Sequence, residues 1–406
     1  MIIGFWRSWA LVVGMMVGSG IFTLPAILAP YGSYSFLAWA ITVVGALSLV
    51  FSMSYMAARN PRAGGPQAYV LEAFGQGPAV VVAWGYWVSL VVAVAAIALS
   101  FAGYLAVFVP VIATNPVFSS LTALGIVWLF TAVCLWGTQQ ASLLQLWTTI
   151  LKIIPLLLLG FAGLSMGDLS NIEPARPNNE SFVTMIAGIM LLIMWSYIGI
   201  EAATIPSDET KDPKKTIPLA LFWGTVTATA VYVLALAGVM ALIPLDQLAS
   251  STHPFADAAN LVFGSWGASL VGIGALISIG GALNACVFLT GSIPHAGAKD
   301  GLFPKALVQS QGRDSSRNAL LMSSGIASLL ILMNASKGLL GSFEFMILIS
   351  TFSVLIVYFG AALAGSKLHS VDKANGREVS PLTLFCSVLG LLFSSAAIYG
   401  AWTLYQ

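Results

Sequence analysis

The sequence has 406 residues, of which 58% are hydrophobic and only 8% are charged, and its formal net charge is +1. An average soluble domain carries about 25% charged residues, so this composition indicates a helical membrane protein with many spans. A nearly neutral chain has no basic footprint for nucleic acid. Its three cysteines follow no metal-ligand or disulfide spacing. We therefore expect neither a metal nor another cofactor.

Apolar runs of about 20 residues, long enough to cross the hydrocarbon core of a bilayer, recur along the whole chain. They predict eleven helices, at residues 8–30, 34–57, 78–109, 117–137, 142–166, 182–205, 217–244, 264–294, 319–336, 343–366 and 381–404. Residues 58–77 mix helix breakers with charges and predict a loop. Residues 167–181 are polar and predict an external loop, whereas residues 246–263 are too polar to span and predict a short surface helix.

Lysine and arginine gather in alternate loops, which orients a membrane protein with these loops in the cytosol. Only Arg176 and Lys337 then lie outside, and Lys152 lies within a helix. The other basic residues face the cytosol, and they are Arg7, Arg59, Arg62, Lys211, Lys214, Lys215, Lys299, Lys305, Arg313, Arg317, Lys367, Lys373 and Arg377. The distribution predicts a multi-pass protein of the cell (inner) membrane, in contact with its lipids, with the N-terminus in the cytosol.

The first apolar run contains Gly18-Ser19-Gly20 near its middle. Two glycines weaken a helix, each by about 0.5–1 kcal/mol relative to alanine. An opened turn survives in a membrane only where it lines a cavity, and such a cavity can bind a polar solute. Small residues also let helices pack closely, and from the triplet alone that interpretation is the commoner one.

Two ionisable residues lie within predicted spans, where a charge is a functional hypothesis by default. Lys152 stands about ten residues into the fifth helix, roughly 15 Å deep, and needs acceptors unless it snorkels to the surface. Glu201 is interfacial if the sixth helix is continuous, and moves toward the centre if that helix opens around Ser196 to Gly199. Paired interruptions in the first and sixth helices point to the binding site of a transporter.

Five short motifs are spread over the first eight helices. They are Gly18-Ser19-Gly20-Ile21-Phe22-Thr23-Leu24-Pro25, Asn60-Pro61-Arg62-Ala63-Gly64-Gly65-Pro66-Gln67-Ala68-Tyr69, Trp195-Ser196-Tyr197-Ile198-Gly199-Ile200-Glu201, Lys211-Asp212-Pro213-Lys214-Lys215-Thr216-Ile217-Pro218 and Lys299-Asp300-Gly301-Leu302-Phe303-Pro304. With these motifs in this order, most of the chain resembles the amino acid–polyamine–organocation (APC) superfamily of transporters. The resemblance is strongest to its bacterial basic amino acid and polyamine antiporters, such as the arginine–agmatine and lysine–cadaverine antiporters.

The resemblance implies an all-α integral membrane protein with the leucine-transporter-type fold. Two inverted five-helix repeats, at residues 1–166 and 182–366, would surround a site at broken helices 1 and 6, with a loop and one further helix at 367–406. Similar transporters usually have twelve helices, one more than the eleven predicted here. The implied substrate-binding residues are Met16, Gly18, Ser19, Gly20, Trp195, Ser196, Ile198 and Cys286. Gating or proton coupling is implied for Lys152, Glu201, Tyr86 and Tyr358.

Within that implied site, the substrate α-carboxylate would meet Ser19 and Gly20. Its α-amino group would meet backbone carbonyls near Met16, Trp195 and Ile198, and Trp195 resembles the outer gate of the antiporters.

Three positions depart from the arginine–agmatine antiporters. Val94 stands where they have an asparagine that helps to read the guanidinium group, and Cys286 stands where they have a tryptophan under the substrate. Both departures favour a neutral or zwitterionic amino acid as substrate, with a cationic amino acid or polyamine as the alternative. Lys152 resembles the helix 5 lysine of proton-coupled relatives, where it takes the place of a sodium ion and ties helix 5 to helix 1.

The sequence thus predicts a secondary active transporter of small-molecule amino acids, working by alternating access as an exchanger or a proton-coupled carrier. It has no nucleotide-binding loop, so ATP is not expected to drive it. A membrane enzyme would need His, Asp or Glu clustered at depth, whereas His253, His295 and His369 are predicted in or beside loops. A non-transporting amino acid sensor is a remote alternative, and a homodimer is one candidate assembly.

Overall fold

A computed structural model describes residues 3–61, 65–136, 141–176, 181–205, 207, 210–307, 317–333 and 335–404. Arg62 and Arg313 of the predicted cytosolic set lie outside these residues, as do Ala63 and Gly64 of the second motif. The helices are α1 (Phe5–Met16), α2 (Ser19–Leu28), α3 (Tyr34–Arg59), α4 (Pro66–Phe74), α5 (Gln76–Leu105), α6 (Val111–Thr114), α7 (Pro116–Trp136), α8 (Ala141–Met166), α9 (Phe182–Met194), α10 (Pro213–Leu242), α11 (Leu245–Leu248), α12 (Pro254–Lys299), α13 (Arg317–Met333), α14 (Gly338–Ala374) and α15 (Pro381–Leu404).

The predicted spans are confirmed within the described residues. Eight helices there are long and apolar enough to cross a membrane. Three shorter apolar helices, Lys152–Met166, Phe182–Tyr197 and Arg317–Met333, coincide with the remaining predicted spans. The protein is therefore an all-α, multi-pass membrane protein. Its division into two inverted repeats stays a prediction.

Three stretches differ from the sequence prediction. Residues 58–77 contain the helix α4. It begins at Pro66, because the first position of a helix does not use the N–H that proline lacks, and it ends before Gly75, which adopts φ +80°. The short outer helix predicted in 246–263 is the beginning of α12, which bends at Gly264 (φ +73°). The last turns of α14 continue to Ala374, so His369 lies in a helix, and His295 likewise lies in α12.

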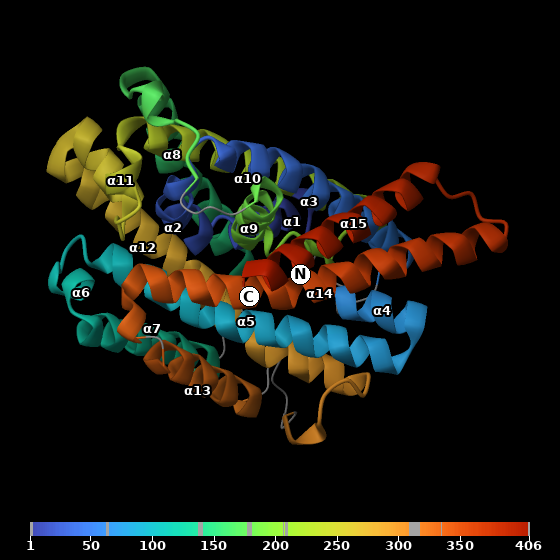
Figure 1. Cartoon of the computed structure of the whole chain (residues 1–406). Coiled ribbons are helices and arrows are strands. Elements are labelled where there is room, and N and C mark those ends of the chain that lie inside the picture. The colour runs from blue at the N-terminus through green and yellow to red at the C-terminus, as the bar shows by residue number, and fades with distance from the viewer. Residues whose placement is uncertain are drawn as a thin grey trace.

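The helices pack as a bundle around α1, α2 and α5. The long helix α5 contacts α14, α12 and α7, while α10 contacts α8, α3 and α1. Figure 1 shows α7 and α13 side by side at one edge, and α15 lying along α14. It also places α4 and the α14–α15 connection at one end of the bundle, with α6 and α11 at the other. That arrangement agrees with the predicted alternation of loops.

Close approach of α8 and α10 depends on glycine. A Cβ added at Gly163 would lie 2.1 Å from the backbone O of Gly238. We expect Gly163→Ala to destabilise the protein by about 1–3 kcal/mol, because a backbone cannot move aside as a flexible side chain can. The check is the melting temperature of the purified protein in detergent.

Gly125 on α7 provides the matched control. A Cβ added there meets nothing within 4 Å. Gly125→Ala should leave the melting temperature unchanged or raise it, since alanine favours a helix over glycine by about 1 kcal/mol. Equal shifts for the two variants would contradict the close-approach explanation.

Candidate substrate-binding site

The first span is interrupted where the sequence predicts. Helix α1 ends at Met16, and α2 begins at Ser19. Between them Val17 (ψ 79°) and Gly18 (φ −132°, ψ −135°) leave the helical conformation. The first N–H groups of α2 have no side-chain cap. A helix N-terminus with free N–H groups attracts an anion, and the end of α1 offers free carbonyls to a cation.

The sixth span opens as well, which confirms the predicted interruption. After α9, residues Trp195–Tyr197 and Ala202–Thr204 form the short 3-10 turns η3 and η4. Between the two turns Gly199 adopts φ +105°, a conformation that favours glycine. A Cβ there would also lie 2.7 Å from the Cβ of Met15, so the opened chain packs directly on the end of α1.

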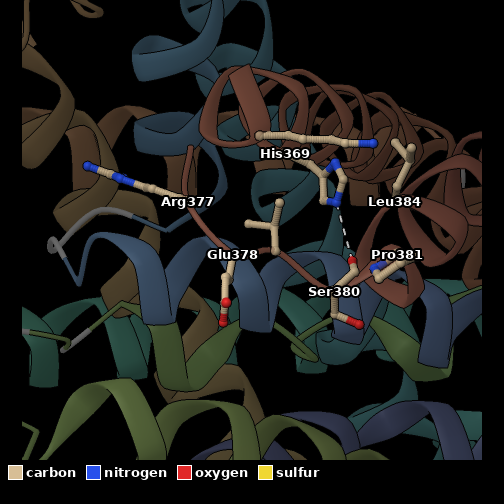
Figure 2. Close-up of a pocket in the computed structure, with 8 residues that line it drawn as sticks. His369, Arg377, Glu378, Ser380, Pro381 and Leu384 are labelled. Carbon is tan, nitrogen blue, oxygen red and sulfur yellow. Dashed lines mark hydrogen bonds between the residues drawn. The ribbon is translucent and has the colours of Figure 1, made fainter. Parts of the chain in front are cut away.

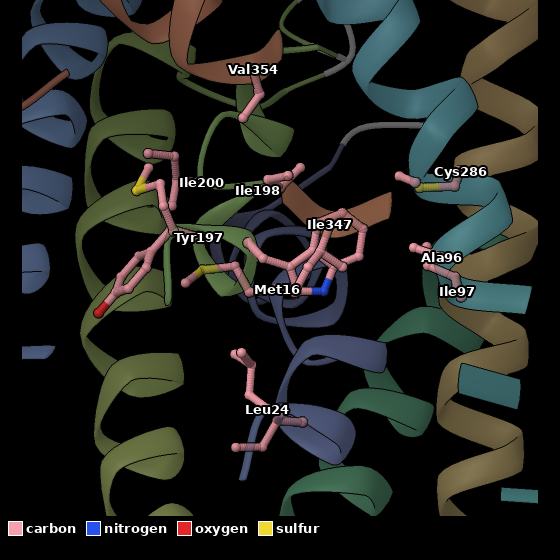
Figure 3. Packing of buried hydrophobic residues seen from close by; sticks show 14 of the residues in the cluster. Met16, Leu24, Ala96, Ile97, Tyr197, Ile198, Ile200, Cys286, Ile347 and Val354 are labelled. Carbon is pink, nitrogen blue, oxygen red and sulfur yellow. The ribbon is translucent and has the colours of Figure 1, made fainter. Parts of the chain in front are cut away.

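A narrow cavity lies between the two interruptions. It is lined by Met15, Met16, Gly18, Ser19, Gly20, Ala93, Ile97, Trp195, Ile198, Ala282 and Cys286. Figure 3 shows Met16 and Ile198 on one side of this region and Ile97 and Cys286 on the other. The structure thus brings seven of the predicted binding residues to one cavity.

Ser196, the eighth predicted binding residue, borders the same space. A Cβ on Gly20 would lie 3.1 Å from its Oγ. This Oγ is buried and has no hydrogen-bond partner among the described residues. An unpaired buried hydroxyl is costly, and a polar substrate beside Gly20 would satisfy it.

Met15, Ala93, Ile97 and Ala282 also line the cavity, although the sequence did not single them out. The available signal was helical spacing, because Ala282 precedes Cys286 by four residues and Ala93 precedes Ile97 by four. Val94 is buried beside Ala93. The lining on α5 is therefore apolar.

Lys152 is only 6% exposed, so it does not snorkel to the surface. Its Nζ donates hydrogen bonds to the carbonyl O of Gly14 (3.0 Å) and of Val17 (2.8 Å), at the end of α1. The Oγ of Ser278 donates to the same Val17 oxygen at 3.3 Å. A cation at a helix C-terminus satisfies free carbonyls and interacts favourably with the helix dipole. As predicted, Lys152 links the fifth span to the opened first span.

Glu201 is fully buried, and two tyrosines hold its carboxylate. Tyr86 of α5 donates to Oε1 at 2.6 Å, and Tyr358 of α14 donates to Oε2 at 2.8 Å. No cationic side chain pairs with Glu201 in the described part of the chain. Such short hydrogen bonds to a carboxylate are strong. Three of the residues to which gating or proton coupling is assigned by resemblance, Glu201, Tyr86 and Tyr358, therefore lie together at one carboxyl group.

Aromatic contacts close the cavity toward the end of the bundle that holds α6 and α11. The Trp195 ring meets Phe343 edge-on, with centroids 6.3 Å apart. Further out, Tyr104 donates its hydroxyl hydrogen to the O of Phe22 at 2.7 Å, and the N–H of Phe255 donates to that hydroxyl at 3.4 Å. The cavity is therefore covered toward the end of the bundle that holds α6 and α11.

A bundle of membrane spans with two opened helices around a buried cavity defines a membrane transporter. The chain belongs to the amino acid permease family, which it matches over residues 3–403. It is 30% identical to a cadaverine/lysine antiporter of Escherichia coli (strain K12) over 98% of this chain and 90% of that protein. It is 25% identical to the putrescine transporter PotE of the same strain, over 95% of this chain and 88% of that protein.

Proposed function

We propose that this protein is a secondary active antiporter that exchanges cationic amino acids, or the amines related to them, across the cell membrane. The observation that carries the proposal is the buried cavity at the start of α2, where free N–H groups and Gly20 face the opened sixth span. This arrangement suits the α-carboxylate of an amino acid. The N-terminus would lie in the cytosol, as the distribution of basic residues predicts.

The relatives favour a cationic substrate over the neutral one that Val94 and Cys286 favour. The names of the two relatives are those of transporters for cadaverine, lysine and putrescine. In this chain Glu201 supports such a substrate, because it is a buried carboxylate without a cationic partner among the described residues. Glu201 does not line the cavity itself, but a cationic substrate would bring the opposite charge into this part of the bundle.

A neutral amino acid is the second candidate, and one observation favours it. The wall of the cavity on α5 and α12 consists of Ala93, Ile97, Ala282 and Cys286, which offer no charge to a side chain. Small apolar walls suit a small aliphatic substrate.

Counterflow in proteoliposomes decides between them. The purified protein is reconstituted with unlabelled lysine, arginine, cadaverine, putrescine, alanine or serine inside, and entry of labelled lysine or alanine is followed at pH 5 and 7.5. We expect labelled lysine to enter only when a cationic amino acid or amine is inside. Entry of alanine driven by alanine or serine, without lysine entry, would replace this proposal by the neutral one. Binding without counterflow would indicate a sensor.

Within this proposal, Met16, Gly18, Ser19, Gly20, Trp195, Ser196, Ile198 and Cys286 form the substrate site. Trp195 would open and close the side that Phe343 covers. Lys152 would keep the opened first span attached to α8, and Glu201 would couple protonation to the position of Tyr86 and Tyr358. The segments on either side of Gly18 and of Gly199 would move together during exchange, because Gly199 packs against Met15 at the end of α1.

A further inference from the structure

A second cavity, separate from the transport site, lies where α14 is connected to α15 (Figure 2). Its volume is about 640 Å³. It is lined by His369, Lys373, Arg377, Glu378, Val379, Ser380, Pro381 and Leu384. We call it the α14–α15 pocket. None of these residues has a role in the proposed exchange.

A buried histidine lines this pocket, and one of its ring nitrogens is unused. His369 is 4% exposed, and its Nε2 lies 3.2 Å from the backbone O of Ser380. A carbonyl oxygen only accepts, so Nε2 carries the hydrogen and Nδ1 of the neutral ring is an acceptor. Nδ1 has no hydrogen-bond partner among the described residues. Its complement is therefore a donor such as a hydroxyl group.

The charges around the pocket favour an anion. Lys373 is exposed and has no hydrogen-bond or ion-pair partner in the described part of the chain. Arg377, with its side chain 62% exposed, uses Nη1 for Asp372 (3.1 Å) and leaves its other N–H groups free. Glu378 is the one acidic residue that lines the pocket. Asp372 also accepts from Arg59 (2.8 Å), so its charge is shared by two arginines.

Helix α15 begins at this pocket and adds to the same preference. Pro381 is its first residue. The N–H of Leu382 donates to the Oγ of Ser380, and the N–H of Thr383 donates to the backbone O of Ser380. The positive end of the helix dipole therefore points at the pocket, where negative charge is stabilised.

The pocket opens beside surfaces that suit lipid. Val371 on α14 and Leu382 and Phe385 on α15 are exposed apolar side chains at the ends of membrane helices. Basic pockets between membrane helices on the cytoplasmic side bind anionic headgroups. The sequence predicts the α14–α15 connection on that side.

We propose that the α14–α15 pocket binds the headgroup of an anionic glycerophospholipid, with phosphatidylglycerol as the matching chemistry. The phosphate lies between Lys373 and Arg377, and a headgroup hydroxyl donates to Nδ1 of His369. The acyl chains lie along the apolar side chains at the start of α15. This lipid site is independent of which substrate the protein exchanges.

Native mass spectrometry of the detergent-purified full chain, titrated with phosphatidylglycerol or phosphatidylcholine, tests the proposal. We expect phosphatidylglycerol to bind more tightly, and Lys373→Gln to weaken it about fivefold, the effect of one basic residue at an anionic membrane surface. Lys373→Gln is the primary variant because it leaves the Asp372 ion pairs intact. The control Lys214→Gln removes another exposed charge, on α10 and outside the pocket, and should leave binding unchanged.

Two further binding measurements identify the ligand. His369→Phe should weaken phosphatidylglycerol more than phosphatidic acid, which lacks the glycerol hydroxyls. Equal losses for both lipids would overturn the role of Nδ1. If soluble glycerol phosphate binds as tightly as phosphatidylglycerol, the lipid assignment is wrong. If Lys214→Gln weakens binding as much as Lys373→Gln, the lipid responds to general charge and the pocket is not its site.

Discussion

Lys152→Met is expected to slow exchange by at least about 100-fold, while the protein still inserts and can be purified. The substitution removes two hydrogen bonds from a charged donor to the carbonyls of Gly14 and Val17. Hydrogen bonds to charged groups contribute about 1.5–3 kcal/mol each, and every 1.4 kcal/mol corresponds to a factor of ten. Without them the end of α1 loses its tie to α8. The measurement is the initial rate of counterflow at pH 5 and 7.5.

Thr149→Val provides the control on the same helix. Its hydroxyl donates to the O of Ala10 at 3.4 Å, beyond the usual range for a strong hydrogen bond, so we expect a change of less than about twofold. If Lys152→Met retains the full rate with an unchanged pH dependence, Lys152 has no part in coupling. If the rate falls but the pH dependence stays the same, Lys152 supports the site without transferring a proton.

The interruption of the first span could be predicted, and one in the sixth span considered, because glycine leaves a local mark. Gly18 and Gly20 stand within an apolar run, and Gly199 marks the second opening. Lys152 and Glu201 could be singled out for a similar reason, since a charge within an apolar run is rare and needs partners. The sequence could not show whether the sixth span was open. That depends on how Gly199 packs against Met15, a contact between distant parts of the chain.

The contacts within the site could not be predicted because their signals are not local. Tyr86 and Tyr358 were singled out by resemblance, but they meet Glu201 across 115 and 157 residues of sequence, and nothing near either tyrosine marks that pairing. Ala93 and Ala282 resemble many other small residues on membrane helices until packing places them at the cavity. The helix α4 was missed because it is short and lies between polar residues, although Pro66 and Gly75 mark its ends.

Substrate preference was the weakest prediction for a related reason. Val94 and Cys286 can be read directly from the sequence, whereas the surroundings of the Glu201 carboxylate depend on the fold. In the structure two tyrosine hydroxyls donate to that carboxylate, and no cationic side chain pairs with it within the described residues. A buried charge without a counter-charge is strongly unfavourable, and the sequence alone does not show that Glu201 lacks one.

Glu201→Gln tests this charge with little change of shape. Glutamine keeps one acceptor for the hydroxyl of Tyr86 or Tyr358 and replaces the other oxygen by a donor, so the contact can persist while the charge is lost. We expect lysine counterflow to fall at least about tenfold, because a hydrogen bond to a charged group contributes about 1.5–3 kcal/mol and the neutral amide weakens it. We also expect the remaining rate to lose its dependence on pH between 5 and 7.5, since glutamine does not titrate.

Tyr358→Phe separates the charge from the hydrogen bonds around it. It removes the 2.8 Å hydrogen bond to Oε2 but leaves the carboxylate and its 2.6 Å bond from Tyr86 in place. A variant of this kind should slow exchange and keep the pH dependence. If both variants slow exchange equally and both remain pH-dependent, Glu201 fastens the opened sixth span to α5 and α14 and the titrating group lies elsewhere. If only Glu201→Gln abolishes the pH dependence, the carboxylate itself takes up the coupled proton, and its two tyrosines transmit that change to α5 and α14.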